Sequence, residues 1–329
     1  MNTKRWLALV LAIVLLFVSI GFKFTINLAS GFLNDVFTFD DYYFDEEIIA
    51  DGDWDSRIAV LNLEGIIMGG DDSLFSTQEY QHDEFIGMIH QAAEDPTVEA
   101  IILQINSPGG AVGETAQIHR ALTEMQDEFD KPLYVSMGSM AASGGYYAAA
   151  PADKIFAEPA TITGSIGVIM ENMNFAGLAE KYGVTFNTIK SGKHKDIMSS
   201  SRDMTKEEKE ILQSIIDEMY DDFVQVIVDG RKMDEATVRE VGDGRIYTGR
   251  QAQEVGLVDE IGTFDDTLNA VRADYDLEDA QVIQYGYGLG FFNMFAVKAQ
   301  NLIQGKNSEL DVVMSLLRQS DKPRAMYIY

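Results

Sequence analysis

The sequence predicts an α/β protein with a mostly parallel β-sheet surrounded by helices, preceded by an N-terminal transmembrane helix. From residue 57 onward, apolar runs typical of buried strands alternate with segments of helical periodicity. This β-α-β-α-β order favours a parallel sheet, because parallel neighbours need a crossover connection that is usually a helix. With 329 residues, 46% of them hydrophobic, the chain is long enough for one large domain or two modest ones.

A candidate membrane anchor opens the chain. Lys4 and Arg5 precede an uncharged apolar run over residues 6–22. The run is longer than the apolar part of most cleaved signal peptides, which favours an uncleaved anchor; a cleaved signal is the alternative. Positive charge before the run and acidic residues after it predict that residues 1–5 are cytoplasmic and that the bulk of the chain lies outside the membrane.

Acidic residues dominate the charge of the chain. It has 53 Asp and Glu against 25 Lys and Arg, a net charge of −28 that argues against nucleic acid or anionic lipid as the main partner. Residues 31–56 hold acidic residues and no basic one, and we expect a solvated stalk, part of which could pack against the domain. The absence of cysteine excludes disulfides and thiolate catalysis, and with four histidines a metal site would be hard to assemble.

Strand and helix patterns follow one another in a regular order. Strands are predicted over residues 58–63, 98–105, 131–136, 154–157 and 185–189, and helices over residues 84–93, 114–129 and 205–229. Thr205 is a good N-cap, with Glu208 at the spacing of a capping box. We expect the apolar stripe of this helix to pack in the core or against another subunit, and we expect an internal or oligomeric helix over residues 291–303.

Ser143 is presented in a way that suits a nucleophile. It stands between small residues, after a predicted strand and before a predicted helix. Gly144 leaves room for a substrate carbonyl, and the N–H groups of a helix start can hold developing negative charge. The glycine-rich stretch 106–110 also follows a strand, and functional groups of parallel α/β sheets collect at such strand ends.

A serine nucleophile needs a base that takes its proton near neutral pH. The histidines lie outside the glycine-rich strand ends, and we expect surface or packing roles for them: His82, His90, His119 and His194. The alternative base is a lysine with a lowered pKa. Three lysines follow the predicted strand 185–189, and their residue type alone does not rank them: Lys190, Lys193 and Lys195.

Four motifs occur in the order and approximate spacing of a known family. They are Asn106-Ser-Pro-Gly-Gly110, Ala141-Ala-Ser143-Gly-Gly145, Thr163-Gly-Ser165-Ile-Gly167 and Ser191-Gly-Lys193-His-Lys195-Asp196. With these motifs and the anchor, the chain resembles the signal peptide peptidase A family, the membrane-anchored bacterial Ser/Lys peptidases, over residues 57–265. The resemblance implies the fold of the Clp protease and crotonase group, and neither a metal nor an organic cofactor.

The resemblance also implies roles for individual residues. It makes Ser143 the nucleophile, Lys195 the general base, Ser165 the group that orients the lysine amine, and Gly110 and Gly144 the oxyanion-hole donors. Asp196 is a complication, because a carboxylate that faces the amine would raise the pKa of the lysine. Neighbours on an extended chain point to opposite sides, so Asp196 could face away. An apolar pocket could be lined by Met137, Met140 and Tyr146, although core packing explains these three equally well.

Substrates and assembly follow from the same resemblance. Released signal peptides and other unfolded apolar peptides at the outer face of the cytoplasmic membrane would be the substrates. Longer relatives carry the lysine and the serine in different halves of one chain, whereas this chain has one half. The dyad would then be shared between protomers of a homo-oligomer, a ring of eight. The apolar tail 323–329 could enter an active site as a self-substrate or plug, or dock on the surface.

The expected organisation has five parts. They are a cytoplasmic N-terminus (1–5), a transmembrane anchor (6–22), an acidic stalk (31–56), a peptidase domain (57–305), and a C-terminal helix and tail (306–329). Two alternatives stay open at this point. One is a crotonase-like acyl-coenzyme A enzyme, against which the anchor and the Ser/Lys pair count. The other is a catalytically inactive membrane scaffold that binds peptides.

Overall fold

The computed structural model describes residues 44–69, 80–286 and 325–328. The predicted anchor (6–22), the apolar stretch 291–303 and residues 306–324 lie outside this part of the chain. Within it, no helix combines the length and the apolar character needed to cross a membrane.

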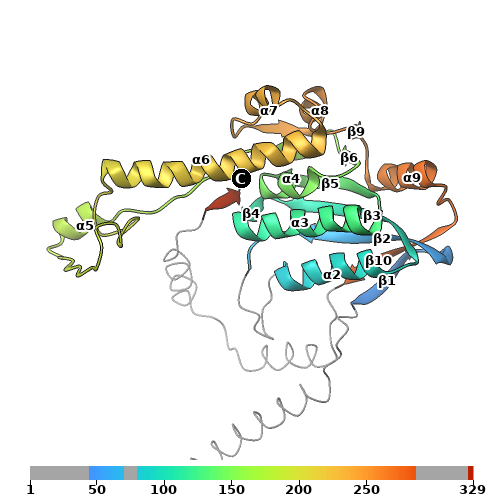
Figure 1. The fold of residues 1–329 in the computed structure, drawn as a ribbon, viewed down its shortest axis with the longest axis horizontal. Helices are drawn as coiled ribbons and strands as arrows, with labels where there is room; N and C mark the ends of the chain where they lie inside the picture. Colours follow the sequence, from blue (N-terminus) through green and yellow to red (C-terminus); the bar gives the residue numbers. More distant parts are fainter. Residues whose placement is uncertain (1–43, 70–79, 287–324, 329) are drawn as a thin grey trace, which may run out of the picture. The chain divides into compact units, whose positions relative to one another are not determined.

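A sheet of nine strands forms the centre of the described domain, and most of its strands run parallel (Figure 1). The strands are β1 (Asp45–Ala50), β2 (Asp53–Glu64), β3 (Val98–Ser107), β5 (Leu133–Ala142), β6 (Lys154–Ala157), β7 (Ile162–Gly164), β8 (Ile246–Thr248), β9 (Glu260–Ile261) and β10 (Ala280–Gly286). Their main order is β1-β10-β2-β3-β5-β6-β9, in which the edge strand β1 pairs antiparallel and the other neighbours pair parallel. Strand β7 runs parallel beside the end of β5, and β8 pairs antiparallel with β7. The predicted α/β class with a mostly parallel sheet is confirmed.

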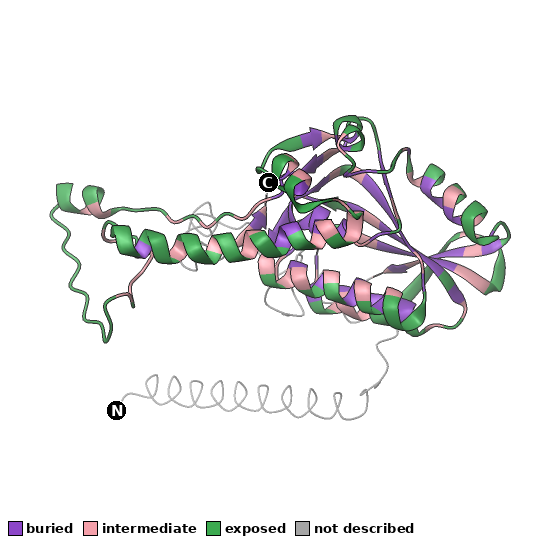
Figure 2. Ribbon diagram, turned by 45° about the horizontal axis from the view of Figure 1, so that its top comes forward, coloured by how far each residue is buried: buried purple, intermediate pink, exposed green. Residues whose placement is uncertain are grey.

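Helices cover both faces of this sheet (Figure 2). The helices of the described residues are α2 (His82–Glu94), α3 (Val112–Phe129), α4 (Gly144–Ala149), α5 (Ala176–Lys181), α6 (Lys206–Arg231), α7 (Glu235–Val241), α8 (Gly249–Glu254) and α9 (Phe264–Tyr275). Strand β2 shows the alternation: Ala59 and Leu61 pack toward α2, α3, α4 and α6, whereas Ile58 and Val60 pack toward α9. Both faces are therefore buried, as expected for a parallel sheet.

Most of the predicted elements are present, and one is not. The patterns over residues 58–63, 84–93, 98–105, 114–129 and 154–157 each fall inside an element of the predicted type. The strand predicted over residues 185–189 is wrong: this segment has no regular structure and its residues are exposed. A β-pattern becomes a strand only when a neighbouring strand pairs with its backbone, and no described strand does so here.

The C-terminal part of the predicted acidic stalk belongs to the folded domain. Strand β1 and the start of β2 lie within the predicted stalk 31–56, so the folded domain begins before residue 57. In β1, Asp45 pairs with Gly286 and Ile48 with Ile283 of β10. The side chains of Asp45–Ile49 are exposed, and such charges on an edge strand discourage pairing with other chains.

The long helix α6 begins as predicted. The Thr205 hydroxyl accepts a hydrogen bond from the amide of Glu208, and the Glu208 carboxylate accepts one from the amide of Thr205, which completes the capping box. Toward its C-terminal end, α6 buries Phe223 and packs closely on α4. Toward its N-terminal end, Ile211 and Ile215 of the same apolar stripe are exposed.

Two consecutive glycines let backbone pack directly on backbone. Gly109 and Gly110 open the short strand β4 (Gly109–Ala111), and Gly109 has φ 95°, a conformation that L side chains rarely adopt. The amide of Ile67 donates to the carbonyl of Gly109 over 2.9 Å, and the amide of Ala111 donates to the carbonyl of Ile67 over 2.7 Å. A Cβ atom on Gly110 would lie 1.8 Å from the carbonyl oxygen of Ile67.

Gly110→Ala should therefore destabilise the protein, by roughly 1–3 kcal/mol or more as other overpacked sites do. Gly113→Ala is the matched control, because a Cβ atom there meets nothing within 4 Å and alanine favours a helix. Chemical denaturation of the two full-length variants measures the difference. Equal stability of the two would contradict the close packing at Gly110.

Candidate active site

Ser143 occupies a strained turn between β5 and α4. Its backbone has φ 53° and ψ −116°, a combination that non-glycine residues seldom adopt outside functional sites. The amide of Ser143 donates to the carbonyl of Gly164 over 2.8 Å, and its carbonyl accepts from the amide of Tyr147 over 2.9 Å. The Oγ atom is buried and makes no hydrogen bond to any described residue. The hydroxyl is therefore held in place and left available for chemistry.

Ser165 lies at the same edge of the sheet as Ser143. Strands β5 and β7 pair Ala142 with Gly164, so the two serines directly follow paired residues. Ser165 is buried and has φ 50°, and its amide donates to the carbonyl of Arg245 over 2.8 Å. The structure therefore brings together the second and third sequence motifs.

The two predicted oxyanion-hole glycines are neighbours. A Cβ atom built on Gly144 would lie 3.1 Å from the amide nitrogen of Gly110, and one built on Gly109 would lie 2.5 Å from the amide nitrogen of Gly144. The same Gly144 position would meet the Oγ1 atom of Thr115 at 2.8 Å, and that buried hydroxyl has no partner among the described residues. Two backbone amides and one unused hydroxyl thus lie together beside the turn of Ser143.

The end of the chain pairs with this site. Strand β11 (Met326–Ile328) runs antiparallel to β4, with Tyr327 opposite Gly110. On its other side, Met326 and Ile169 exchange two backbone hydrogen bonds of 3.0 Å. The carbonyl oxygen of Tyr327 would lie 2.2 Å from a Cβ atom on Gly109, so it comes close to the Gly144 amide as well. An extended segment therefore lies between β4 and the backbone of Ile169 at the candidate oxyanion hole.

An aromatic pocket that the sequence did not reveal receives the side chain of Tyr327. This ring is 1% exposed, stacks on Tyr147 with centroids 5.1 Å apart, and lies 4.8 Å from the ring of Phe223. Its hydroxyl donates to the carbonyl of Met219 over 3.0 Å. Tyr147 follows Ser143 by four residues, and an aromatic residue in a short buried helix gave no signal of this contact.

The three predicted pocket residues have other surroundings. Met137 and Tyr146 are buried in the core of the sheet, and the Tyr146 hydroxyl donates to the carbonyl of Leu257 over 2.8 Å. Core packing, the alternative weighed from the sequence, therefore describes these two residues. Met140 is half-buried, near the end of β5.

The three candidate lysines differ in their partners. Lys190 forms an ion pair with Asp196, and Lys193 forms one with Glu207. Lys195 is exposed, and its side-chain amine makes no hydrogen bond or ion pair with any described residue. Among the described residues, its amine is therefore the unpaired one of the three.

Lys195 and Ser143 are not brought together within one chain. The segment that carries Lys195 contacts Glu207 and Glu208 in the first turn of α6, whereas α4 packs against Phe223, nearer the other end. At 1.5 Å per residue, Glu208 and Phe223 are about 22 Å apart along the helix axis. Figure 1 shows this separation, with α5 beside the start of α6 and α4 beside its later turns.

None of the histidines replaces the lysine. His82 lies between the Tyr80 hydroxyl, at 2.6 Å, and Gln117, at 3.1 Å. The His119 ring packs edge-on against Tyr147, and burial lowers the pKa of His119 to about 4, a shift that Asp229 partly opposes. His119 is therefore neutral at physiological pH, and its contacts are those of a packing residue.

Comparisons with known proteins show the family of this chain. A model of peptidase family S49 matches residues 125–278. Over 100% of its length, the chain is 37% identical to a protein of Enterococcus faecium that bears the provisional name signal peptide peptidase SppA, of which the match covers 99%. Protease 4 of Haemophilus influenzae is 35% identical over 65% of this chain and 34% of its own length. The chloroplastic serine protease SPPA of Arabidopsis thaliana is 34% identical over 55% of this chain and 26% of its own.

The buried serine at a strand end and these similarities define the protein as a serine peptidase. The predicted hydrolytic activity is thereby confirmed at the level of its class. Within that class, the chain belongs to the signal peptide peptidase A family of S49 peptidases.

The lowered pKa of His119 predicts a pH dependence of stability. The unfolded chain binds a proton on this imidazole near pH 6.5, whereas the folded chain binds it near pH 4, so stability should fall as the pH drops from about 6.5 to about 4. His119→Gln should reduce this loss by roughly 1–3 kcal/mol, with the partial exposure of the ring favouring the lower end. The exposed His90→Gln is the control. Urea denaturation at pH 7 and pH 4.5 measures it, and identical losses in all three proteins would contradict the prediction.

The paired tail predicts that Ser143 is shielded. Tyr327→Ala removes an aromatic side chain from a packed pocket, which typically costs about 3–5 kcal/mol. If the tail then leaves β4, a fluorophosphonate should label Ser143 at least about tenfold faster. Met326→Ala, a half-buried change on the same strand, is the control. Labelling of Tyr327→Ala at the wild-type rate would show that the tail does not limit access.

Proposed function

We propose that this protein is a membrane-bound endopeptidase in which Ser143 is the nucleophile and Lys195 the general base. Its substrates would be released signal peptides and other unfolded apolar peptides at the outer face of the cytoplasmic membrane. The observation that carries this proposal is the buried, unpartnered Oγ atom of Ser143, in a strained turn beside the adjacent glycines of two strand ends. This geometry suits attack on a carbonyl whose oxygen needs stabilisation.

The reaction cycle follows from the roles of these groups. The neutral amine of Lys195 takes the proton of Ser143 as Oγ attacks the scissile carbonyl. The tetrahedral oxyanion accepts hydrogen bonds from the amides of Gly110 and Gly144, while Ser165 orients the lysine amine. The lysine ammonium then gives its proton to the leaving amine. A water molecule activated by the same lysine hydrolyses the acyl-enzyme and restores the serine.

The pairing of the tail supports a peptide as the substrate. Strand β11 adds to β4 by backbone pairing, while an aromatic side chain fills a pocket, which is how peptides are recognised at sheet edges. Backbone pairing tolerates many sequences, because it uses groups that every residue has. The pocket of Tyr147 and Phe223 adds a preference for apolar or aromatic side chains. These two features fit a peptidase that acts on unfolded apolar segments.

A dyad shared between protomers is part of the proposal. The separation along α6 leaves Lys195 without a serine in its own chain, so a second copy would have to supply one. The segment that carries the lysine exposes large apolar side chains, as an interface would: Met173, Phe175, Leu178, Tyr182, Val184, Phe186 and Ile189. By the same resemblance, eight copies would form a ring through such interfaces. The resemblance also implies the fold of the Clp protease and crotonase group. The apolar run 6–22 would anchor the ring in the membrane.

Mixing two inactive variants tests the shared dyad. Ser143→Ala and Lys195→Ala should each lose roughly a thousandfold or more in peptidase activity, because each removes a group that acts in bond formation. When the two full-length variants are co-expressed and assemble at random, about a quarter of the sites should join an intact serine to an intact lysine. Hydrolysis of a fluorogenic apolar peptide should then recover to about that fraction.

Lys193→Ala is the matched control for the lysine, and it should keep near wild-type activity. A Lys195→Ala protein with full activity would remove the lysine from the mechanism. Two inactive variants that co-assemble without recovery would place both groups of the dyad in one chain.

A further inference from the structure

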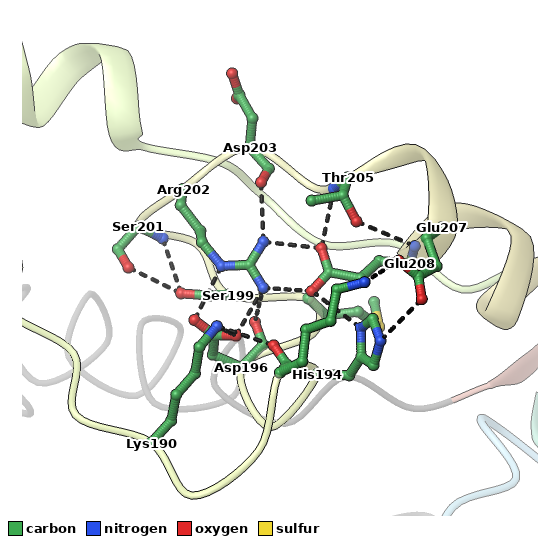
Figure 3. A network of polar contacts seen from close by, with 12 residues as sticks. Lys190, His194, Asp196, Ser199, Ser201, Arg202, Asp203, Thr205, Glu207 and Glu208 are labelled. Carbon is green, nitrogen blue, oxygen red and sulfur yellow. Dashed lines mark hydrogen bonds and ion pairs between the residues drawn. The ribbon is translucent and has the colours of Figure 1, made fainter.

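The turn that carries Lys195 is built around Arg202 (Figure 3). We call residues 190–202 the lysine turn. The five N–H groups of the Arg202 guanidinium reach six acceptor atoms, in two carboxylates and two backbone carbonyls, with three of these acceptors sharing the two N–H groups of Nη2. Four of these contacts form two bidentate pairs, one with Asp196 over 2.9 and 2.7 Å and one with Glu208 over 2.8 and 2.5 Å. Arginine suits this place because its planar fork of donors matches two carboxylates at once.

Glu208, in the first turn of α6, is the residue through which Arg202 binds this helix. Its carboxylate is 2% exposed and also accepts the amide of Thr205 in the capping box. The hydrogen bonds from Arg202, followed by those from Thr205, lower the pKa of Glu208 to about 2. The carboxylate is therefore ionised at neutral and mildly acidic pH. Arg202 thus links the backbone and the side chain of Asp196 to the first turn of a long helix.

The negative charge of Asp196 is compensated by two cationic side chains. Hydrogen bonds from Arg202 and then from Lys190 hold the pKa of Asp196 far below its ordinary value. The Nζ atom of Lys190 donates to Asp196 over 2.5 Å and to the carbonyl of Lys193 over 3.0 Å. Two carboxylates and two cations are therefore combined, and their formal charges cancel. The carboxylate next to Lys195 in sequence is fully engaged by other groups.

Apart from Lys195, the remaining cationic groups of the turn also lie beside carboxylates. Lys193 pairs with Glu207, whose second oxygen lies 3.4 Å from His194 Nε2, and His194 Nδ1 lies 3.7 Å from Glu208. The carboxylate of Asp203, just after the turn, accepts from the side-chain amide of Asn174. Of the cationic side chains between residues 190 and 202, Lys195 is the one without a partner in the described chain.

We propose that Arg202 is the positioning residue for Lys195: it holds the Asp196 carboxylate on the α6 side of the turn and keeps it from pairing with the lysine amine. This inference rests on the proposed role of Lys195 as general base. The two bidentate pairs join Arg202 to Asp196 and Glu208, whose side chains are 14% and 2% exposed, so they also help to hold the turn in place. A base that must lose its proton near neutral pH gives them a further role, because a facing carboxylate would stabilise its ammonium form.

The pH profile of kcat/KM separates positioning from mere stabilisation. In Arg202→Ala, the Asp196 carboxylate keeps only Lys190 as a cationic partner, so its side chain can turn toward Lys195. The lysine should then hold its proton more tightly, and the acidic limb of the profile should move to higher pH by roughly one unit. At a pH on that limb, the rate should fall about tenfold. The double variant Arg202→Ala, Asp196→Asn lacks the carboxylate, and its limb should return to the wild-type position.

Two further variants serve as controls. Arg239→Ala breaks ion pairs with two carboxylates, Asp221 and Glu235, that lie outside the lysine turn, and it should leave the limb in place. Arg202→Lys keeps the positive charge without the planar fork, so it should move the limb less than Arg202→Ala does. This variant also keeps the test usable if Arg202→Ala fails to fold.

A measurement that needs no activity separates this inference from the proposed function. Competitive acetylation of the full-length Ser143→Ala protein, followed by mass spectrometry of the Lys195 peptide, reports the protonation of this amine across pH. We expect the Arg202→Ala change to move this titration to higher pH, and Asp196→Asn to move it back.

If the titration moves as expected while Lys195→Ala keeps full peptidase activity, the proposed function fails and the electrostatic role of Arg202 stands. The inference is overturned if Arg202→Ala changes neither the Lys195 titration nor the acidic limb of the kcat/KM profile. It is also overturned if Arg239→Ala moves both by the same amount as Arg202→Ala. A limb that moves up and is not restored by Asp196→Asn also overturns it, since the effect then does not pass through that carboxylate.

Discussion

The hydrogen bond from the amide of Ser143 to the carbonyl of Gly164 is the interaction on which the candidate active site depends. It extends the pairing of β5 with β7 by one residue and holds Ser143 at φ 53°, a conformation that costs a non-glycine residue about 1–3 kcal/mol. The same pairing places Ser165 at the neighbouring position. Helix α4 has only six residues, so the sheet, rather than the helix, provides the rigidity that offsets this strain.

Part of this site could be predicted from the sequence because it depends on strand ends. Ser143 and Gly110 follow buried apolar runs, and the carboxyl ends of parallel strands meet at one edge whatever the details of packing. Ser165 was assigned from the resemblance alone. The pocket of Tyr147 could not be predicted, because an aromatic residue in a buried helix has the same sequence pattern whether it packs in a core or contacts a ligand. Glu208 was found as a capping residue, but its bond to Arg202, six residues earlier, follows no standard capping or helix spacing.

The strand predicted over residues 185–189 is wrong for a physical reason that bears on the assembly. Alternating apolar residues predict a strand because they suit a half-buried surface, and here the chain itself supplies no such surface. Ile189 is fully exposed at the start of the lysine turn. A pattern of burial without a partner in the same chain is what an oligomer would produce, so the wrong prediction agrees with a lysine that acts on another copy's serine.

The charge of the whole chain makes the isolation of Lys195 a demanding requirement. At a net charge of −28, carboxylates surround most cations, and each nearby carboxylate favours the protonated form of an amine. Cations of the lysine turn other than Lys195 pair with the carboxylates of the turn and of the start of α6. Three acidic side chains thus have cationic partners without Lys195: Asp196, Glu207 and Glu208. An acidic exterior and the proposed lysine base are therefore compatible in one protein, because the other cations of the turn pair with its carboxylates.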